Sequence, residues 1–126
     1  MANVLIVDDS PTARMLVRRC LQIAGYGADQ MFEAEHGRAA LDVLRVQSID
    51  LAVVDLNMPV MDGRTLIRFM RSSPRHNSIP IIVVSSLVND TAAAELVAMG
   101  ASTVLKKPLS PAAMASAIAE LQGVAA

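Results

Sequence analysis

The chain has few aromatic residues, a single cysteine and no long apolar stretch, and each shortage excludes a class of protein. Aromatic residues make up 2% of the 126 residues, too few to interleave with basic side chains on a nucleic-acid-binding surface. The only cysteine, Cys20, cannot form an internal disulfide. No stretch approaches the roughly 20 consecutive apolar residues of a membrane span. We therefore expect no binding to nucleic acid or membrane.

An excess of charge of one sign is missing as well. The net charge is -1 at pH 7, so no overall field favours polyanionic partners. Hydrophobic residues are 53% of the chain, enough for a sizeable core, and the length fits one domain, which we expect to span residues 1–126. The first residues lead directly into an apolar run, without the pattern of a signal peptide. These features together predict a cytoplasmic protein.

Five short apolar runs alternate with five amphipathic segments. The runs, which predict strands, are residues 4–7, 30–34, 51–54, 81–84 and 102–106. Three of them are continuous Val, Ile and Leu, as in strands covered on both faces. The last is mixed and ends in two lysines, as an edge strand often does. The amphipathic segments predict helices at residues 11–24, 38–46, 64–71, 90–99 and 111–121.

Local signals mark the ends of these helices. Ser10 and Ser110 each precede a proline, the pattern of an N-cap followed by proline in the first turn. Gly25 and Gly100 follow the last apolar positions of two segments and predict their ends. Asp62 is expected to serve turn and cap chemistry. The first helix should bury its residues spaced three and four apart, which are Ala13, Leu16, Val17, Cys20, Leu21 and Ala24.

The repeated strand–helix alternation predicts an α/β fold with a doubly wound sheet of five parallel strands and helices on both faces. The common order of five such strands is 2-1-3-4-5, with the switch point between strands 1 and 3. Neighbouring strands lie about 5 Å apart. Asp8 and Asp9, after the first strand, should therefore lie next to Asp55, after the third.

Four strand ends carry polar groups that this fold would gather into one site: Asp8 with Asp9, Asp55, Ser85 and Lys107. Three close carboxylates repel one another, so either one is protonated or a cation lies among them. Oxygen ligands without a nearby His or Cys suit Mg²⁺. An ionised Asp55 would then be a nucleophile that forms an aspartyl phosphate. The metal, Lys107 and the Ser85 hydroxyl would contact the three equatorial oxygens of the phosphoryl group.

Each residue alone has a simpler interpretation. A single Asp before a helix is usually a cap or a favourable charge at the helix N-terminus. A lysine after a strand is usually solvated, and Ser86 competes with its neighbour for the role of hydroxyl donor. His36 and His76 are isolated and are expected to be exposed. The functional prediction therefore depends on the whole set and on its order along the strands.

At these positions the chain resembles the receiver domain of two-component response regulators, a flavodoxin-like or CheY-like (βα)5 sandwich. The matching motifs are residues 7–10, 54–63, 84–86 and 106–108, and the likeness covers essentially the whole chain. The resemblance implies that Asp55 accepts a phosphoryl group from the phosphohistidine of a sensor histidine kinase or a phosphotransfer protein. It also implies a bond before Pro108 that is often cis.

The resemblance assigns a role to every other residue of the set. Mg²⁺ would be bound by Asp9, Asp55 and the backbone carbonyl of Asn57, with Asp8 reached through water. Ser85 would be the switch hydroxyl, and Lys107 would pair with the phosphate. Two departures concern the response to phosphorylation. They are Val104, where the family usually has a switch aromatic, and Leu87, where a polar or acidic residue is frequent.

Two surfaces are predicted to bind partners. The first helix should direct Arg14, Met15 and Arg18 outward, and we hypothesise that they dock the phosphohistidine domain together with Leu109. The alternative is a solvated basic face. The last two helices and the last strand are rich in alanine, and the resemblance makes their surface an output or dimer face. The expected state is a monomer or a phosphorylation-dependent dimer.

The leading functional prediction is a stand-alone phosphorylation-dependent switch, because no output domain is expected after the last helix. Such a protein is not an enzyme in the usual sense but a phosphoacceptor that assists its own phosphorylation and dephosphorylation. Its output goes through a downstream partner protein, and residues 11–18 resemble chemotaxis-type regulators. Two alternatives remain open. One is an aspartate-nucleophile phosphohydrolase, which usually has a second Asp where Asn57 stands. The other is a receiver-like interaction module that is never phosphorylated.

Overall fold

The computed structural model describes residues 2–86 and 89–123. The prediction about Leu87 therefore falls outside the described part of the chain. Strands and helices alternate five times. The strands are β1 (Ala2–Val7), β2 (Ala28–Ala34), β3 (Leu51–Asp55), β4 (Ile81–Ser85) and β5 (Thr103–Lys106). The helices are α1 (Pro11–Ile23), α2 (Gly37–Val46), α3 (Gly63–Ser72), α4 (Asp90–Met99) and α5 (Pro111–Leu121). All ten predicted elements are confirmed.

The strands form one parallel sheet in the predicted order β2-β1-β3-β4-β5. The first strand pairs with both β2 and β3, so it lies next to the switch point of the sheet. In the register of β1 and β3, Val7 pairs with Val54. An aspartate follows each of these residues, Asp8 after Val7 and Asp55 after Val54, so the two aspartates come to lie side by side. This register builds the site.

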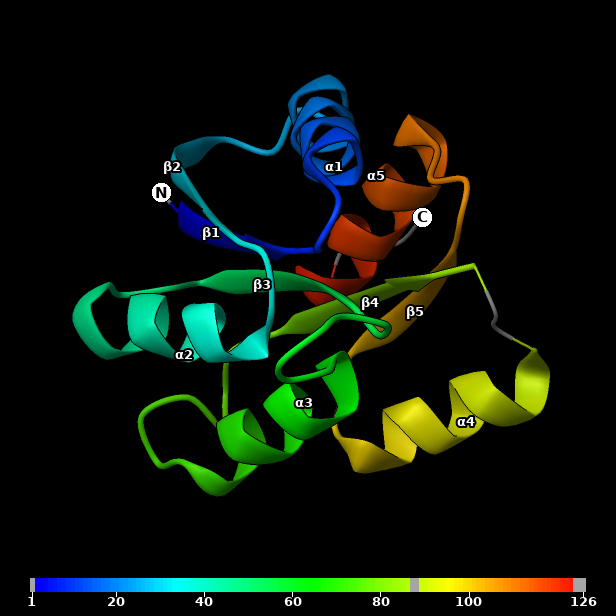
Figure 1. Cartoon of the computed structure of the whole chain (residues 1–126). Helices are drawn as coiled ribbons and strands as arrows, with labels where there is room; N and C mark the ends of the chain where they lie inside the picture. The colour runs from blue at the N-terminus through cyan, green and yellow to red at the C-terminus, as the bar shows by residue number, and fades with distance from the viewer. Residues whose placement is uncertain (1, 87–88, 124–126) are drawn as a thin grey trace.

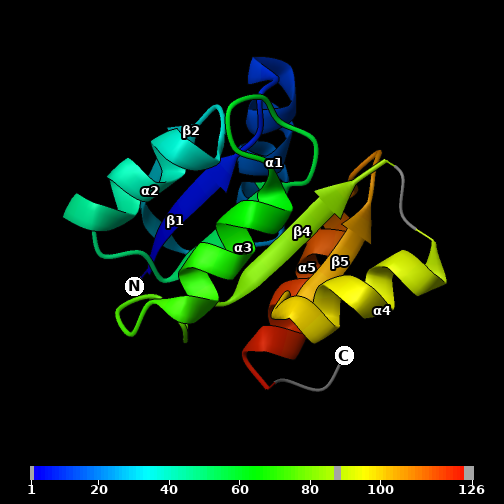
Figure 2. The same cartoon turned by 60° about the horizontal axis from the view of Figure 1, so that its bottom comes forward.

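The sheet separates two hydrophobic cores. Helices α1 and α5 cover one face, and α2, α3 and α4 cover the other (Figures 1 and 2). The strands β3 and β4 and the last four residues of β1 are buried on both faces. The core under α1 and α5 contains Val17, Cys20, Leu21, Met114, Ala117 and Ile118. The core under α2 to α4 contains Ala40, Leu44, Leu66, Ile67, Met70 and Leu96.

Strand ends and one core position differ from the sequence-based expectation. Asp55 and Ser85 are the last residues of β3 and β4 rather than the first residues after them. Backbone pairing continues through these polar residues because it does not depend on the side chain. Leu16 was expected in the core but is 43% exposed. It lies on the flank of α1, where it lines an open groove together with Pro108 and Leu109.

The helix N-caps are formed by side chains that accept hydrogen bonds from the first turn. Ser10, Asp62 and Ser110 do so as predicted. The prediction that both histidines are isolated and exposed is wrong. The His36 side chain caps α2 by accepting a hydrogen bond from the Ala39 amide, and His76 lies half-buried with Nε2 3.2 Å from the carbonyl oxygen of Leu44. Histidine is not a usual cap residue, so this contact could not be predicted from the sequence.

Candidate functional site

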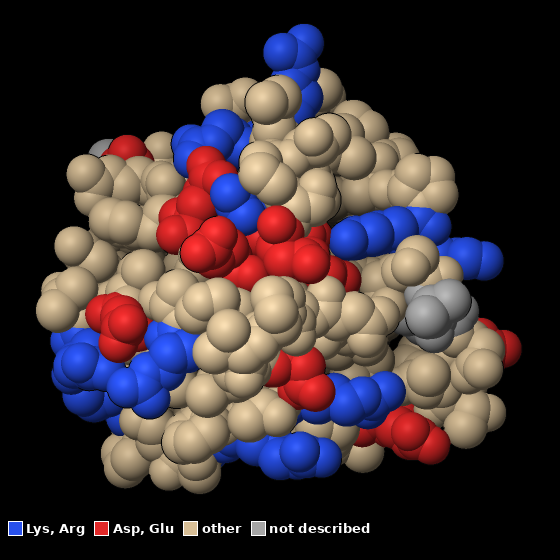
Figure 3. Space-filling model, in the orientation of Figure 1, with Lys and Arg blue, Asp and Glu red and all other residues tan. Residues whose placement is uncertain are grey.

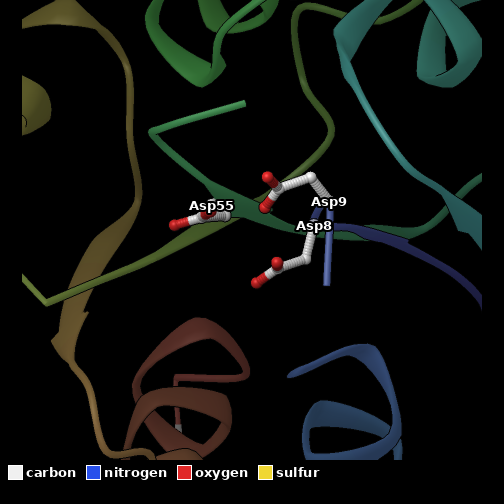
Figure 4. Close-up of side chains that lie close together, drawn as sticks. All are labelled: Asp8, Asp9 and Asp55. Atoms are coloured by element: carbon white, nitrogen blue, oxygen red, sulfur yellow. The ribbon is translucent and has the colours of Figure 1, made fainter. Parts of the chain in front are cut away.

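Three carboxylates meet at the carboxyl ends of β1 and β3 (Figure 4). Asp8, Asp9 and Asp55 each have a carboxylate oxygen within 4.8 Å of those of the other two. Asp8 is 3% exposed and Asp55 is 7% exposed, whereas Asp9 lies at the surface. Figure 3 shows acidic side chains gathered near the middle of this face, with basic side chains beside them. The structure therefore places the three acids together as the sequence predicted.

Lys107 lies between the two buried acids. Its Nζ is 3.0 Å from Asp8 Oδ2 and 3.4 Å from Asp55 Oδ1. Burial lowers the pKa of Lys107, but its hydrogen bonds and charge attraction to the two carboxylates outweigh burial and raise the pKa above its ordinary value. The ammonium group is therefore held in its charged form beside the two carboxylates. The bond between Lys107 and Pro108 is cis, as predicted.

The surroundings of Asp55 disfavour the ionised form of its carboxyl group. Burial and, after it, the charge of Asp8 raise the pKa of Asp55, and Lys107 offsets only part of that effect. A divalent cation among the three carboxylates would reverse this penalty. The cluster offers only carboxylate oxygens, which are hard ligands, and contains no histidine or cysteine. This donor set fits Mg²⁺.

The loop between β3 and α3 approaches the site closely. The Gly63 amide donates a hydrogen bond to the Leu56 carbonyl oxygen over 2.9 Å, and a Cβ on Gly63 would collide with the carbonyl oxygen of Asp55. Val60, in the same loop, has φ 65°, a conformation that valine rarely adopts. The side chain of Asn57, whose carbonyl was predicted to bind the metal, is exposed. The backbone of Asp55 is thus fixed by a loop that admits only glycine at position 63.

The remaining predicted residues lie on β4, directly after it, and on β5. Ser85 ends β4 and is 1% exposed. Ser86, the competing hydroxyl, is exposed and lines the groove beside α1. Val104 lies half-buried in β5 and packs against the core under α2 to α4. This position holds no aromatic ring that could move between inward and outward orientations.

Two arginines of α1 are less free at the surface than predicted. Arg14 and Arg18 do not point freely outward, because both bind Glu33 of β2, with N–O distances of 2.8 and 2.6 Å. Arg14 also donates a hydrogen bond to the Asp8 carbonyl oxygen over 2.6 Å. The sequence did not reveal these contacts, since Glu33 comes close only when β2 pairs with β1. Met15 is 67% exposed, as predicted.

A groove runs beside α1 next to Lys107. It has a volume of about 360 Å³ and is lined by Ala13, Leu16, Val17, Val84, Ser86, Lys107, Pro108 and Leu109. Leu109, which is predicted to take part in docking, is 7% exposed and belongs to the core under α1 and α5. It forms part of the wall of the groove, since the chain turns inward between β5 and α5.

Comparison with known proteins agrees with this fold and site. The family model described as the response regulator receiver domain matches residues 4–119. A chemotaxis protein CheY homolog of Campylobacter jejuni is 29% identical over 96% of this chain and 92% of its own length. The sensor protein EvgS of Escherichia coli is 34% identical over 98% of this chain, which corresponds to 10% of that protein.

Solved structures show the same likeness. The chemotaxis response regulator CheY4 of Vibrio cholerae is 34% identical with a TM-score of 0.80, and the alignment covers 99% of both chains. The receiver domain of a histidine kinase from Syntrophus aciditrophicus is 30% identical with a TM-score of 0.82, covering 98% of this chain and 92% of that one.

The fold and the acidic cluster define a class of protein, the doubly wound CheY-like signalling domains. The chain belongs to the response regulator receiver domain family and is a phosphorelay response regulator domain of two-component signalling. Receiver domains are in general phosphoacceptor switches that bind Mg²⁺ in an acidic pocket and interact with histidine kinases and downstream proteins. In the described part of this chain, no helix has the length and apolar character needed to cross a membrane.

Proposed function

We propose that Asp55 is the phosphoacceptor of a single receiver domain spanning residues 1–126. The observation that supports this most strongly is that Asp55 lies beside two other aspartates and Lys107. The phosphoryl donor is the phosphohistidine of a sensor kinase or of a phosphotransfer protein. Asp8, Asp9, Asp55 and the backbone carbonyl of Asn57 hold Mg²⁺, which would neutralise charge on a phosphoryl oxygen.

The transfer requires little of the protein beyond positioning and charge. An oxygen of Asp55 attacks phosphorus, the bond from phosphorus to the imidazole nitrogen breaks, and its electron pair returns to the imidazole ring. Lys107 lies within reach of a phosphoryl group on Asp55, because it is 3.4 Å from Oδ1 of that residue. Ser85 ends the neighbouring strand β4, and its hydroxyl donates a hydrogen bond to the same phosphoryl group. Phosphorylation then shifts the population of the loops after β3 and β4 towards a state that binds a partner.

The direct test is modification by a small phosphodonor. Acetyl phosphate with Mg²⁺ should add one phosphoryl group to the wild-type protein, detected by intact-mass spectrometry. Asp55→Asn should abolish the modification, whereas the control Asp42→Asn removes an exposed carboxylate of α2 and should leave it unchanged. A wild-type protein that stays unmodified, also with beryllofluoride as a phosphate mimic, would support a receiver-like interaction module instead.

A phosphohydrolase is the second candidate function, since such enzymes also form aspartyl phosphates. The exposed Asn57 stands where they usually have an acid, and an amide cannot transfer the proton that a leaving group needs. Steady hydrolysis of a phosphate ester, lost in Asp55→Asn, would favour this alternative. Labelling of Asp55 by acetyl phosphate without hydrolysis of a phosphate ester would favour the phosphoacceptor switch.

We propose that the kinase or phosphotransfer domain docks on α1 beside the groove. The docking residues are Arg14, Met15, Arg18 and Leu109, of which Leu109 lines the groove. An exposed methionine next to an apolar groove and basic side chains is typical of a binding surface. Met15→Glu should slow phosphorylation by a cognate kinase by about tenfold and leave labelling by acetyl phosphate unchanged. Ile23→Glu is the matched control, because Ile23 is 59% exposed at the other end of α1. Equal effects of both variants would contradict the proposal.

The proposed output is a change in affinity for a downstream protein in chemotaxis, a pathway that the names of several relatives support. The proposed output surface is the alanine-rich face of α4, β5 and α5, used by a partner or by a second phosphorylated copy. With Val104 in β5, the signal would reach this face through the loops rather than through a rotating ring.

A further inference from the structure

Arg14 connects three elements around the acidic site. It belongs to α1, its Nε lies 2.8 Å from Oε1 of Glu33 on β2, and its guanidinium group donates to the Asp8 carbonyl oxygen at the end of β1 over 2.6 Å. Its side chain is only 15% exposed. A guanidinium group held by a carboxylate on one side is well placed to fix a carbonyl group on the other.

The carbonyl group that Arg14 holds belongs to the peptide between Asp8 and Asp9. The rest of Asp8 is held as well: its amide donates to the Ala34 carbonyl oxygen, and its carboxylate accepts from the Ser10 amide and from Lys107. Asp9 is exposed, and its direction is set by the peptide that precedes it. If this peptide were free to rotate, Asp9 would lose more conformational entropy on binding a cation.

We propose that Arg14 is a positioning residue for the metal site. Anchored by Glu33, it fixes the peptide between Asp8 and Asp9 and so strengthens the binding of a divalent cation. This inference rests on the proposed function, because that function requires the metal. It gives Arg14 a role that is separate from docking on the surface of α1.

Arg18 provides a matched control on the same helix. It binds the other oxygen of Glu33 over 2.6 Å, so it contributes to the same ion-pair network. Its second contact, however, is with the carbonyl oxygen of Met31 in β2 over 3.4 Å, away from the peptide of the two acids. Loss of Arg18 should therefore weaken the contact between α1 and β2 without releasing the Asp8 carbonyl group.

The sign of the effect separates positioning from plain electrostatics. Arg14 is positively charged, and removing a positive charge near a cation site favours cation binding. A purely electrostatic role therefore predicts equal or tighter binding of Mg²⁺ in Arg14→Ala. A role restricted to partner docking predicts no change. Only the positioning role predicts weaker binding.

The experiment is a calorimetric titration of the full chain with MgCl₂ at constant ionic strength, without phosphodonor. Arg14→Ala should raise the Kd for Mg²⁺ about tenfold, as is usual when a group that orients a metal ligand is removed. Arg18→Ala should stay within about twofold of wild type. Arg14→Lys, which keeps one charge but has only one nitrogen to serve both partners, should lie between wild type and Arg14→Ala.

The outcomes distinguish failure of the inference from failure of the proposed function. Wild-type affinity in Arg14→Ala, or an equal loss in Arg18→Ala, would overturn the positioning role while leaving the metal site intact. A wild-type protein that does not bind Mg²⁺ would overturn the metal site itself, and the inference with it. Should Arg14→Ala fail to fold by circular dichroism, the comparison of Arg14→Lys with Arg18→Lys decides, since both keep the charge.

Discussion

Val60 lies in a backbone conformation that costs stability. Its φ is 65°, and its side chain is 79% exposed, so no buried contact compensates. Left-handed backbone costs an ordinary residue about 1–2 kcal/mol, whereas asparagine tolerates it. Val60→Asn should therefore raise the free energy of unfolding by about 1 kcal/mol in urea denaturation. Val46→Asn is the control, since Val46 is equally exposed at the end of α2, and it should give no gain.

Gly63 gives a prediction of opposite sign in the same loop. A Cβ at this position would collide with the carbonyl oxygen of Asp55 and lie 2.9 Å from Cα of Leu56, and neither backbone atom can move without the strand. Gly63→Ala should lower the free energy of unfolding by about 2–3 kcal/mol and reduce labelling of Asp55 by acetyl phosphate. Gly27→Ala should change neither, because a Cβ there would have no neighbour within 4 Å. An unaffected Gly63→Ala protein would show that the loop is not rigid.

The sequence predicts that the three acids come together, but it does not predict the contacts that hold them in place. Asp8, Asp9 and Asp55 follow apolar runs, and the common strand order alone brings them together. The bond from Arg14 to Glu33 joins residues that are 19 positions apart, and it exists only because β2 pairs with β1. Helical spacing predicts which side of α1 faces the core, but it does not predict that the Glu33 carboxylate of β2 lies beside Arg14.

The elements α1 and β2 are linked by an ion pair whose strength should depend on pH. Hydrogen bonds, first from Arg18 and then from Arg14, hold the pKa of Glu33 below its ordinary value. Its stabilising contribution is therefore complete above the pKa of an unfolded glutamate, about 4.3, and disappears as the pH falls through the lower pKa of the folded state. Since Glu33 is partly exposed, solvent screening keeps the contribution small.

Glu33→Gln tests this link between the two elements. The variant should unfold at lower urea concentration than wild type at pH 6, and the difference should shrink as the pH is lowered from about 5 towards 2. In an Arg18→Ala background, the same substitution should have a smaller effect, because the first cause of the lowered pKa is gone. A difference that is independent of pH would mean that Glu33 acts through packing and not through its charge.

Element boundaries were predicted well where apolar periodicity is strong and less well at polar ends. Helix α4 has its predicted bounds, because Gly100 ends it with φ 123°. Strand β2 begins two residues earlier than predicted, at Ala28, since pairing with β1 extends it through polar residues. The groove beside α1 had no signal in the sequence. Leu16, which the helical spacing placed in the core, is 43% exposed and lines this groove instead.

For the whole molecule, Mg²⁺ should act as a stabilising ligand. The three carboxylates come together only in the folded chain, so the cation binds the folded state and stabilises it. At a concentration about ten times its Kd, Mg²⁺ should raise the free energy of unfolding by about 1.4 kcal/mol and the Tm by about 4–7 °C.

Thermal unfolding monitored by circular dichroism measures this shift. Chelation of the metal should reverse it, and Asp9→Asn should nearly abolish it. Asp42→Asn, which removes an exposed carboxylate of α2, should keep the full shift. If NaCl at the same ionic strength raised the Tm equally, the effect would be screening of charge repulsion and not binding at the site.

The register of the strands also determines where the chain can change its length. Val7 pairs with Val54, and Asp55 pairs with Val84, so a one-residue deletion inside β3 would move Leu56 to the place of Asp55 and turn the side chains after the deletion to the opposite face. Residues 73–80, between α3 and β4, lie at the amino ends of the strands, opposite to the acids at the carboxyl ends. Insertions and deletions among relatives should therefore accumulate in such loops, while the lengths of the central strands stay constant.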